Sequence, residues 1–336
     1  MSNPEARPDE VACAPGRVGD LEVLAPREVP LGGPRAMRVR RTLPQRSRSL
    51  IGAWCFVDHY GPDRVADSGG MSVAPHPHTG LQTVSWLFEG EITHRDSAGH
   101  HATVRPGEVN LMTAGRGISH SEVSTADTEV LHGAQLWVAL PDAARDTAPG
   151  FEHYAPPRVA GPGWSARVFL GSLLGSDSPV ATFTPLLGAE VVLEPGAVLE
   201  VDVDPAFEHG VLVDVGDLEV GAGEGGVDAK AADLAYVPPG ARRLRLDAGP
   251  EGARVLVLGG TPFGESIVMW WNFVGRSHEE VVAFRAAWQE QVVGPDGTPV
   301  TDGQAVAEGR FGVVLGETLP PIPAPVLPTV RLRERR

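Results

Sequence analysis

The sequence has few cysteines, no long apolar run and fewer basic than acidic residues. Its two cysteines, Cys13 and Cys55, can form one bridge at most, which excludes a disulfide framework and a metal site dominated by thiolates. No apolar run is long enough to span a bilayer, and residues 1–8 lack the basic start and apolar core of a signal peptide. The net charge of −15 disfavours non-specific binding to nucleic acid or anionic membranes. We therefore expect a cytoplasmic protein without membrane or direct nucleic-acid contact.

Glycine and proline are abundant, and they divide the chain into short segments. The 336 residues include 41 glycines and 31 prolines, which favours many turns over long helices. β-rich runs at 83–88 and 130–140 end at turns, and 190–220 contains further strand-like runs separated by Pro-Gly and Gly-Asp turns. Segment 87–92 parallels 213–218 in its strand, Gly-acid turn and strand pattern. This similarity predicts an all-β protein built from a duplicated small barrel.

Changes in composition suggest where the parts of the chain begin and end. The predicted parts are a flexible N-terminal tail at 1–18, a first barrel at 19–145, a linker rich in Pro, Ala and Gly at 146–165, a second barrel at 166–275, and a C-terminal helix and tail at 276–336. The helix prediction rests on a capping box formed by Ser277 and Glu280. Val281, Phe284 and Trp288 then recur at helical spacing.

A cluster of arginines at 35–48 has two interpretations. It could be an arm that binds nucleic acid. However, Arg38 and Arg40 alternate with the apolar Met37 and Val39, a pattern typical of a strand with one solvated basic face. We favour the strand.

Two pairs of potential metal ligands occur at spacing i, i+2. His76 and His78 flank a proline, and His120 and Glu122 follow a loop with two glycines. Residues two apart on a strand point to the same face, roughly 7 Å from each other. If the two pairs face each other, three imidazoles and one carboxylate meet, a donor set suited to a divalent transition metal.

The other histidines carry weaker signals. His59, His153 and His209 each occur singly, and we interpret them as ordinary surface residues. The pair at 100–101 belongs to a predicted loop tip. His94 is close enough in sequence to reach the mouth of a metal pocket, although a structural role is the stronger expectation.

The segments around the metal motifs resemble the pirin family of the cupin superfamily. The similar runs are PHPHTGLQTVSW at 75–86, HRDSAG at 94–99, MTAGRGISHSE at 112–122, and shorter segments at 56–62, 135–141, 262–267 and 309–312. They extend over about residues 35 to 312. One departure is Val268–Phe273, where many family members have a polar stretch. Trp270 and Trp271 in this segment are expected to reshape the surface between the domains.

The resemblance implies a bicupin, with two antiparallel jelly-roll barrels and metal only in the first. The family's ligand motif falls on His76, His78, His120 and Glu122. The family metal is usually Fe(II), while Ni, Mn, Cu, Zn or Co could bind the same donors, depending on availability. The second barrel lacks both ligand motifs, which implies a degenerate, structural domain. We expect a monomer.

The resemblance implies two possible functions and leaves a third. In the first, the protein is a quercetin 2,3-dioxygenase that takes a flavonol and O2, with Glu122 also serving as the catalytic base. Phe56, Trp86 and Met112 would then line an apolar pocket, or else belong to the barrel core. In the second, it is a redox-sensing, metal-dependent regulator that binds a protein partner, either transcription-related or a metabolic enzyme. The third is a stable bicupin with a vestigial site, which the four intact donors disfavour.

Overall fold

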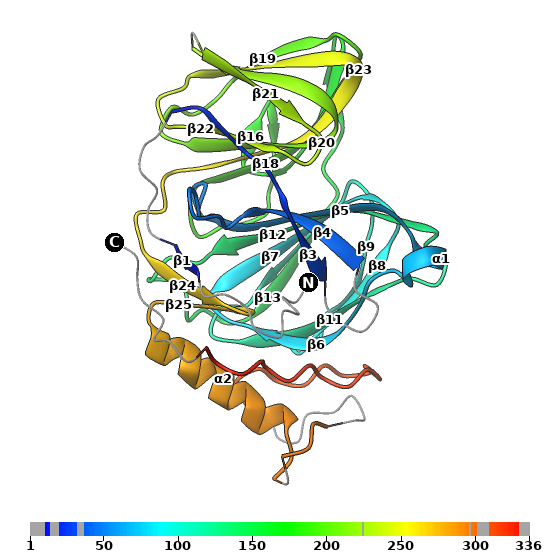
Figure 1. Cartoon of the computed structure of the whole chain (residues 1–336), viewed down its shortest axis with the longest axis vertical. Helices are drawn as coiled ribbons and strands as arrows, with labels where there is room; N and C mark the ends of the chain where they lie inside the picture. The colour runs from blue at the N-terminus through cyan, green and yellow to red at the C-terminus, as the bar shows by residue number, and fades with distance from the viewer. Residues whose placement is uncertain are drawn as a thin grey trace.

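The computed structural model of the chain describes residues 11–13, 20–31, 37–223, 225–295, 297–300 and 309–328. Two β-sheet bodies are stacked on one another, and a helix lies beyond the first of them (Figure 1). The prediction of an all-β bicupin with a C-terminal helix is confirmed. Among the described residues, no helix has the length and apolar character that crossing a membrane requires.

The first barrel is formed by two antiparallel sheets. The larger sheet contains, in spatial order, β13 (Gly150–Tyr154), β10 (Val109–Thr113), β7 (Leu81–Glu89), β12 (Val130–Ala139), β5 (Trp54–Arg64), β4 (Met37–Leu43) and β3 (Arg27–Leu31). The smaller contains β6 (Ser72–His78), β11 (Ile118–Ser124), β8 (Ile92–Asp96) and β9 (His101–Val104). A short helix, α1 (Val65–Ser68), follows β5. Because β6 is an edge strand, its two prolines interrupt no central ladder.

The second barrel is formed by one nine-stranded antiparallel sheet. Its main path is β14 (Val159–Gly161), β15 (Trp164–Leu170), β18 (Leu186–Leu193), β23 (Arg243–Gly260), β20 (Glu208–Ala222), β22 (Leu234–Val237) and β2 (Glu22–Leu24), while β19 (Val198–Asp202) pairs with β23 and β21 (Gly225–Lys230) with β20. The short strands β16 (Ser172–Leu173) and β17 (Ser176–Asp177) form a separate ribbon. Strand β2 comes from the N-terminal part of the chain, so the two barrels are linked by strand pairing as well as by packing.

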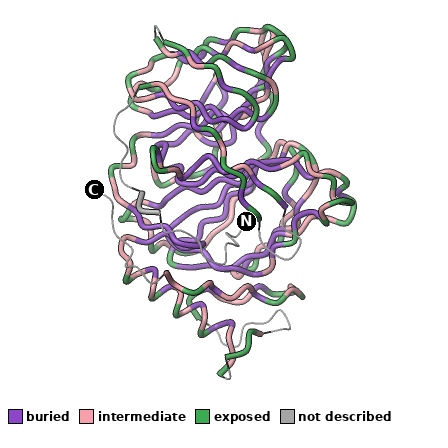
Figure 2. The backbone as a smooth tube through the Cα atoms, in the orientation of Figure 1, coloured by how far each residue is buried: buried purple, intermediate pink, exposed green. Residues whose placement is uncertain are grey.

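The two barrels share a core. Figure 2 shows buried segments running through both bodies and across the contact between them. One apolar cluster joins Trp54 and Trp86 of the first barrel to Phe169 and Tyr236 of the second. Trp86 stacks on Phe169 with ring centroids 4.6 Å apart. The relative placement of the barrels is therefore fixed by aromatic packing.

The arginine-rich segment forms β4, as the alternation predicts, but only part of it is solvated. The side chain of Arg38 is 78% exposed. Arg41 is buried and forms a bidentate pair with Asp58, and the buried Arg48 lies over the ring of Tyr236 at 3.2 Å. These buried arginines hold the structure together and are not available to nucleic acid.

The predicted helix is α2 (His278–Val292), and its cap is confirmed. Ser277 accepts a hydrogen bond from the backbone N–H of Glu280, while the Glu280 carboxylate accepts from the backbone N–H of Arg276. The buried side chains of α2 pack on the hairpin of β24 (Ile267–Trp270) and β25 (Phe273–Gly275). A further strand, β1 (Val11–Cys13), pairs with β24.

The expectation for the two tryptophans is wrong. Trp270 and Trp271 are buried at 1% and 4% exposure in the cluster with Phe273 and α2, not at the contact between the barrels. The hairpin that carries them closes against the first barrel, where Thr79 pairs with Phe273.

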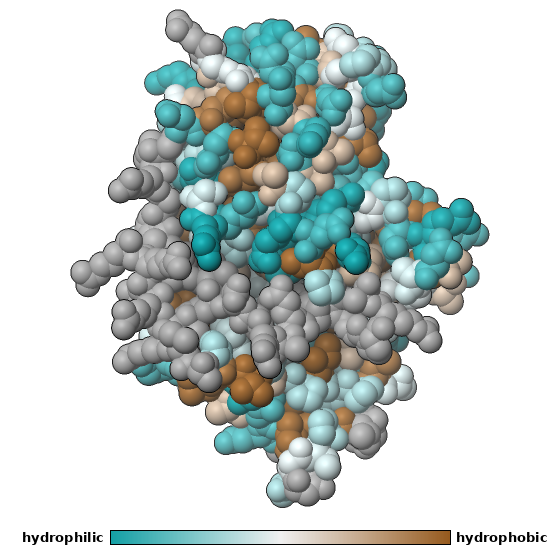
Figure 3. Space-filling view, viewed as in Figure 1, coloured by the Kyte–Doolittle hydropathy of each residue, from teal (hydrophilic) through white to brown (hydrophobic). Residues whose placement is uncertain are grey.

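The exposed surface is mixed in character. On the face in Figure 3, hydrophilic residues are interspersed with hydrophobic ones over the second barrel. Large exposed apolar side chains among the described residues are few: Phe183, Val192, Val198, Val215, Leu315 and Val326. Single exposed apolar residues of this kind are normal and indicate no function.

Candidate metal centre

The predicted ligands lie on neighbouring strands of the smaller sheet. His76 on β6 pairs directly with His120 on β11, and His78 pairs with Ile118. A bulge separates His120 from Glu122, which pairs with His94 on β8. The pairing of β6 with β11 and of β11 with β8 therefore brings the predicted ligands next to one another.

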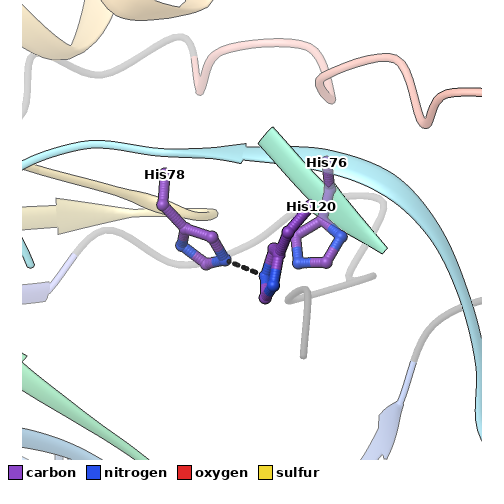
Figure 4. Close-up of side chains that lie close together, drawn as sticks. All are labelled: His76, His78 and His120. Atoms are coloured by element: carbon purple, nitrogen blue, oxygen red, sulfur yellow. Dashed lines mark hydrogen bonds between the residues drawn. The ribbon is translucent and has the colours of Figure 1, made fainter. Parts of the chain in front are cut away.

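Three imidazoles converge inside the barrel. Figure 4 shows His76, His78 and His120 turned toward one point. The Nε2 atoms of His78 and His120 are 3.1 Å apart, and all three residues place a ligand atom within 4.8 Å of the others. Each side chain is completely buried.

Backbone carbonyls fix the orientation of two of these rings. The Nδ1 of His76 lies 2.9 Å from the carbonyl of Ala74, and that of His78 lies 3.2 Å from the carbonyl of Asn272. Because a carbonyl only accepts, each Nδ1 carries the proton and each Nε2 presents a lone pair to the centre.

The centre has the properties that a divalent metal requires. The Nε2 of His76 is buried without a hydrogen-bond partner. Burial lowers the pKa of His76 to about 3 and lowers the pKa values of His78 and His120 as well, so all three rings are neutral at pH 7. Buried polar atoms are rarely unpaired, and neutral imidazole is the form that binds metal, so the donors fit a divalent ion.

His120 also belongs to a second group, which it forms with His94 and Glu122. These three residues also have ligand atoms within 4.8 Å of one another, so the two groups share His120. His94 is 3% exposed, and its Nδ1 is 3.4 Å from that of His120. Its Nε2 lies 3.3 Å from Asp96. The structure thus places His94 in direct contact with the centre, closer than the expected pocket mouth.

Sequence reasoning missed two polar residues beside Glu122. The Ser85 hydroxyl on β7 lies 3.4 Å from Oε1 of Glu122 and 2.9 Å from the side-chain oxygen of Gln135 on β12. Both residues are buried. In the run 83–88, Ser85 is polar between apolar neighbours, and this alternation indicates that Ser85 and Trp86 face opposite sides of the sheet.

The predicted pocket-wall residues belong to the core. Trp86 points toward the second barrel and donates from Nε1 to Glu190 at 3.1 Å. Phe56 and Met112 are 3% and 1% exposed within a cluster that also contains Trp137. Two aromatic residues lie beside the centre: Trp137, with its ring 5.2 Å from that of His78, and Phe151, with its ring 4.9 Å from that of His94.

The C-terminal segment 309–328 runs along the strands that carry the ligands. Ser119 donates to the carbonyl of Phe311, Ser121 donates to Glu317 at 2.6 Å, and the backbone N–H of Ile322 donates to the carbonyl of Pro75. Gly115 in the loop before β11 has φ 51°, and a Cβ there would overlap the carbonyl of Thr147. Glycine at this position therefore lets the loop before β11 pass close to the backbone of Thr147.

The single histidines are not all on the surface. The side chain of His153 is 43% exposed, but His59 and His209 are buried at 1% and 0% exposure. Burial lowers the pKa of both. His132 belongs to no motif in the sequence, yet it lies beside His59 with ring centroids 5.6 Å apart.

Comparisons with known families and sequences agree with this architecture. The pirin family model matches residues 36–138, and the model described as "Pirin C-terminal cupin domain" matches residues 188–294. A Pseudomonas aeruginosa protein with the name "Putative quercetin 2,3-dioxygenase" is 45% identical over 86% of this chain and 91% of its own length.

Solved structures show the same fold. A structure of quercetin 2,3-dioxygenase from Acinetobacter baumannii has a TM-score of 0.82 and 36% identity, covering 94% of this chain and 98% of that chain. A bacterial pirin of Escherichia coli in complex with nickel(II) is similar in fold, with a TM-score of 0.56 and 18% identity over 72% of this chain and 99% of its own.

Proposed function

The chain belongs to the pirin family, and on that basis we propose that it is an iron-binding protein with quercetin 2,3-dioxygenase activity. The observation that carries the proposal is the convergence of three buried imidazoles with an unpaired Nε2 on His76. The names of the Pseudomonas relative and the Acinetobacter structure support the reaction class. The substrates would be a flavonol and O2, and the products a phenolic ester and carbon monoxide.

We assign the metal ligands to His76, His78, His120 and Glu122. When bound, the metal would supply open coordination positions for substrate oxygen atoms. Fe(II) is the metal we propose, although the donor set would also accept Ni, Mn, Cu, Zn or Co. The carbonyls of Ala74 and Asn272 would keep two of the imidazoles in the ligating tautomer.

Glu122 is the residue we propose as the catalytic base. Its carboxylate is buried at 1% exposure beside the imidazoles, where it would accept the proton of the flavonol 3-hydroxyl. Ser85, 3.4 Å from Oε1, would hold the carboxylate in position. Trp137 is the apolar residue best placed to meet the flavonol, because its ring lies beside His78.

The test is anaerobic reconstitution with Fe(II), followed by quercetin and then oxygen. Loss of the flavonol absorbance together with release of carbon monoxide is expected. The double variant His76→Ala, His120→Ala should bind little Fe(II) at the first-barrel site and leave quercetin intact. Absence of turnover at one Fe(II) per first-barrel site would refute the dioxygenase proposal.

A redox-sensing regulator is a second candidate, and one observation favours it. Segment 309–328 contacts the ligand strands through Ser119 and Ser121, so a charge change at the metal could alter an accessible segment of the chain. Pull-down from a lysate under reducing and oxidising conditions should then recover different protein partners. Identical partners in both conditions would count against a switch.

A further inference from the structure

A second cluster of metal-binding side chains lies where the two barrels meet. His59 on β5 and His132 on β12 belong to the first barrel, and Asp214 on β20 belongs to the second. The Nε2 atoms of both histidines are 2.6 Å from the same carboxylate oxygen, Oδ1 of Asp214. All three side chains are at least 95% buried.

Hydrogen bonding satisfies only part of this cluster. The Nε2 of His59 is hydrogen-bonded to Oδ1 of Asp214. The Nε2 of His132 is at the same distance from that oxygen, but it is not aligned for a hydrogen bond and has no other partner. A buried nitrogen of this kind is costly. The unpaired Nε2 of His76 in the first centre has the same character.

The carboxylate is held from its other side. Arg254 donates from Nε to Oδ2 of Asp214 at 2.5 Å, and its guanidinium lies 4.3 Å from the ring centre of Phe88. This contact leaves Oδ1 directed at the two imidazoles. An outer partner that fixes a ligating carboxylate is typical of metal sites.

The charges around the cluster are balanced. Three arginines are positive, Arg254, Arg167 and the half-buried Arg40, and three carboxylates are negative, Asp214, Glu28 and the buried Glu190. Each arginine interacts electrostatically with at least one of these carboxylates. The formal charges cancel, so no net positive charge opposes a cation at the two imidazoles.

We propose that His59, His132 and Asp214 bind a second divalent transition-metal ion across the contact between the barrels. Two imidazoles and one carboxylate form a recognised donor set for Zn(II) and related ions. Because the donors come from both barrels and are buried, the ion would have a structural role and would connect β5 and β12 to β20. This proposal is independent of any reaction at the first centre.

The test uses the full-length double variant His76→Ala, His120→Ala, which removes two donors of the first centre. Metal-free protein is incubated with Zn(II), desalted and analysed for bound metal. One Zn(II) per chain is expected, and wild-type protein should retain one more equivalent than this variant. In the same background, Asp214→Asn should reduce Zn(II) affinity at least tenfold. Asp217→Asn is the matched control, a carboxylate-to-amide change at an exposed position on the same strand, and it should keep the Zn(II).

Failure to fold would not obscure the result. Near-ultraviolet circular dichroism reports whether each variant keeps its packed aromatic residues. If Asp214→Asn is unfolded, His132→Gln replaces it and should also lose Zn(II). A folded double variant that retains no Zn(II), or retains it equally with Asp214→Asn or His132→Gln, would overturn the proposal and leave a hydrogen-bonded contact only.

Discussion

The Nδ1 of His78 lies 3.2 Å from the backbone carbonyl oxygen of Asn272, a residue 194 positions further along the chain. Asn272 belongs to the turn between β24 and β25, in which the preceding residue, Trp271, has a φ of 54°. Bulky residues rarely adopt this conformation, and surrounding packing must maintain it. The orientation of a first-barrel imidazole therefore depends on a hairpin that packs under α2.

Trp271→Ala should weaken metal binding without removing any ligand. The change removes the packing of Trp271 on Phe273, whose rings are 5.4 Å apart, and lets the turn relax away from His78. Loss of an outer partner of this kind typically lowers metal affinity by about tenfold or more. Competition with a chelator measures the affinity. Trp164→Ala in the second barrel is the control, and an equal loss there would contradict the explanation.

Ser85→Ala should reduce quercetin turnover, because the hydroxyl beside Glu122 would no longer hold its carboxylate. We expect kcat/KM to fall about tenfold, in line with the loss of one hydrogen bond to a charged group. The Fe(II) content should change little. The matched control is Ser121→Ala on β11, since Ser121 bonds Glu317 outside the centre. Equal turnover in Ser85→Ala and wild type would exclude the positioning role.

Ser277→Ala should destabilise the C-terminal helix. The hydroxyl accepts the N–H of Glu280 at the start of α2, and loss of such a cap costs about 1 kcal/mol of unfolding free energy. Denaturant unfolding measures the change. Ser72→Ala is the comparison, since Ser72 is exposed on a strand and caps no helix. A similar loss in both variants would argue against the cap.

The stability of the protein should fall as the pH drops from 6.5 to 4, in part because of His209. Burial lowers its pKa to about 4, and neither ring nitrogen has a hydrogen-bond partner. In the unfolded chain the pKa is about 6.5, so in this window the unfolded state binds the proton and the folded state does not. The neutral His209 makes its full contribution to the unfolding free energy above pH 6.5. Loss of this contribution on acidification lowers the unfolding free energy by roughly 3 kcal/mol.

Unfolding free energies measured between pH 4 and 7 test this effect. His209→Gln should flatten the pH dependence, because glutamine does not titrate. His101→Gln serves as the control, since His101 is exposed on β9. If His209→Gln keeps the wild-type slope, another group is responsible for the acid sensitivity.

Several features could be predicted because they depend on residues close together in the sequence. The i, i+2 pairs of His76, His78, His120 and Glu122 share a face because a strand has a period of two. The cap at Ser277 needs only the next three residues. The segments around these residues also contained the family resemblance, and the two barrels followed from it.

Other features depended on tertiary contacts, which the sequence does not encode locally. The bond between Ser85 and Glu122 needs two sheets to face each other, and Trp86, its neighbour, is turned to the opposite side. His59 resembled a surface histidine because its partner, Asp214, is 155 residues away on the other barrel.

The sequence by itself thus determined the donor types, their pairing and the β architecture, since these follow from local periodicity and composition. Only the tertiary structure decided that His59, His94 and His132 each lie beside other potential metal ligands. Strand register brings His94 to Glu122, and the packing of one barrel on the other brings Asp214 to the remaining two. Both depend on contacts between distant segments, whose energies are spread over many core residues.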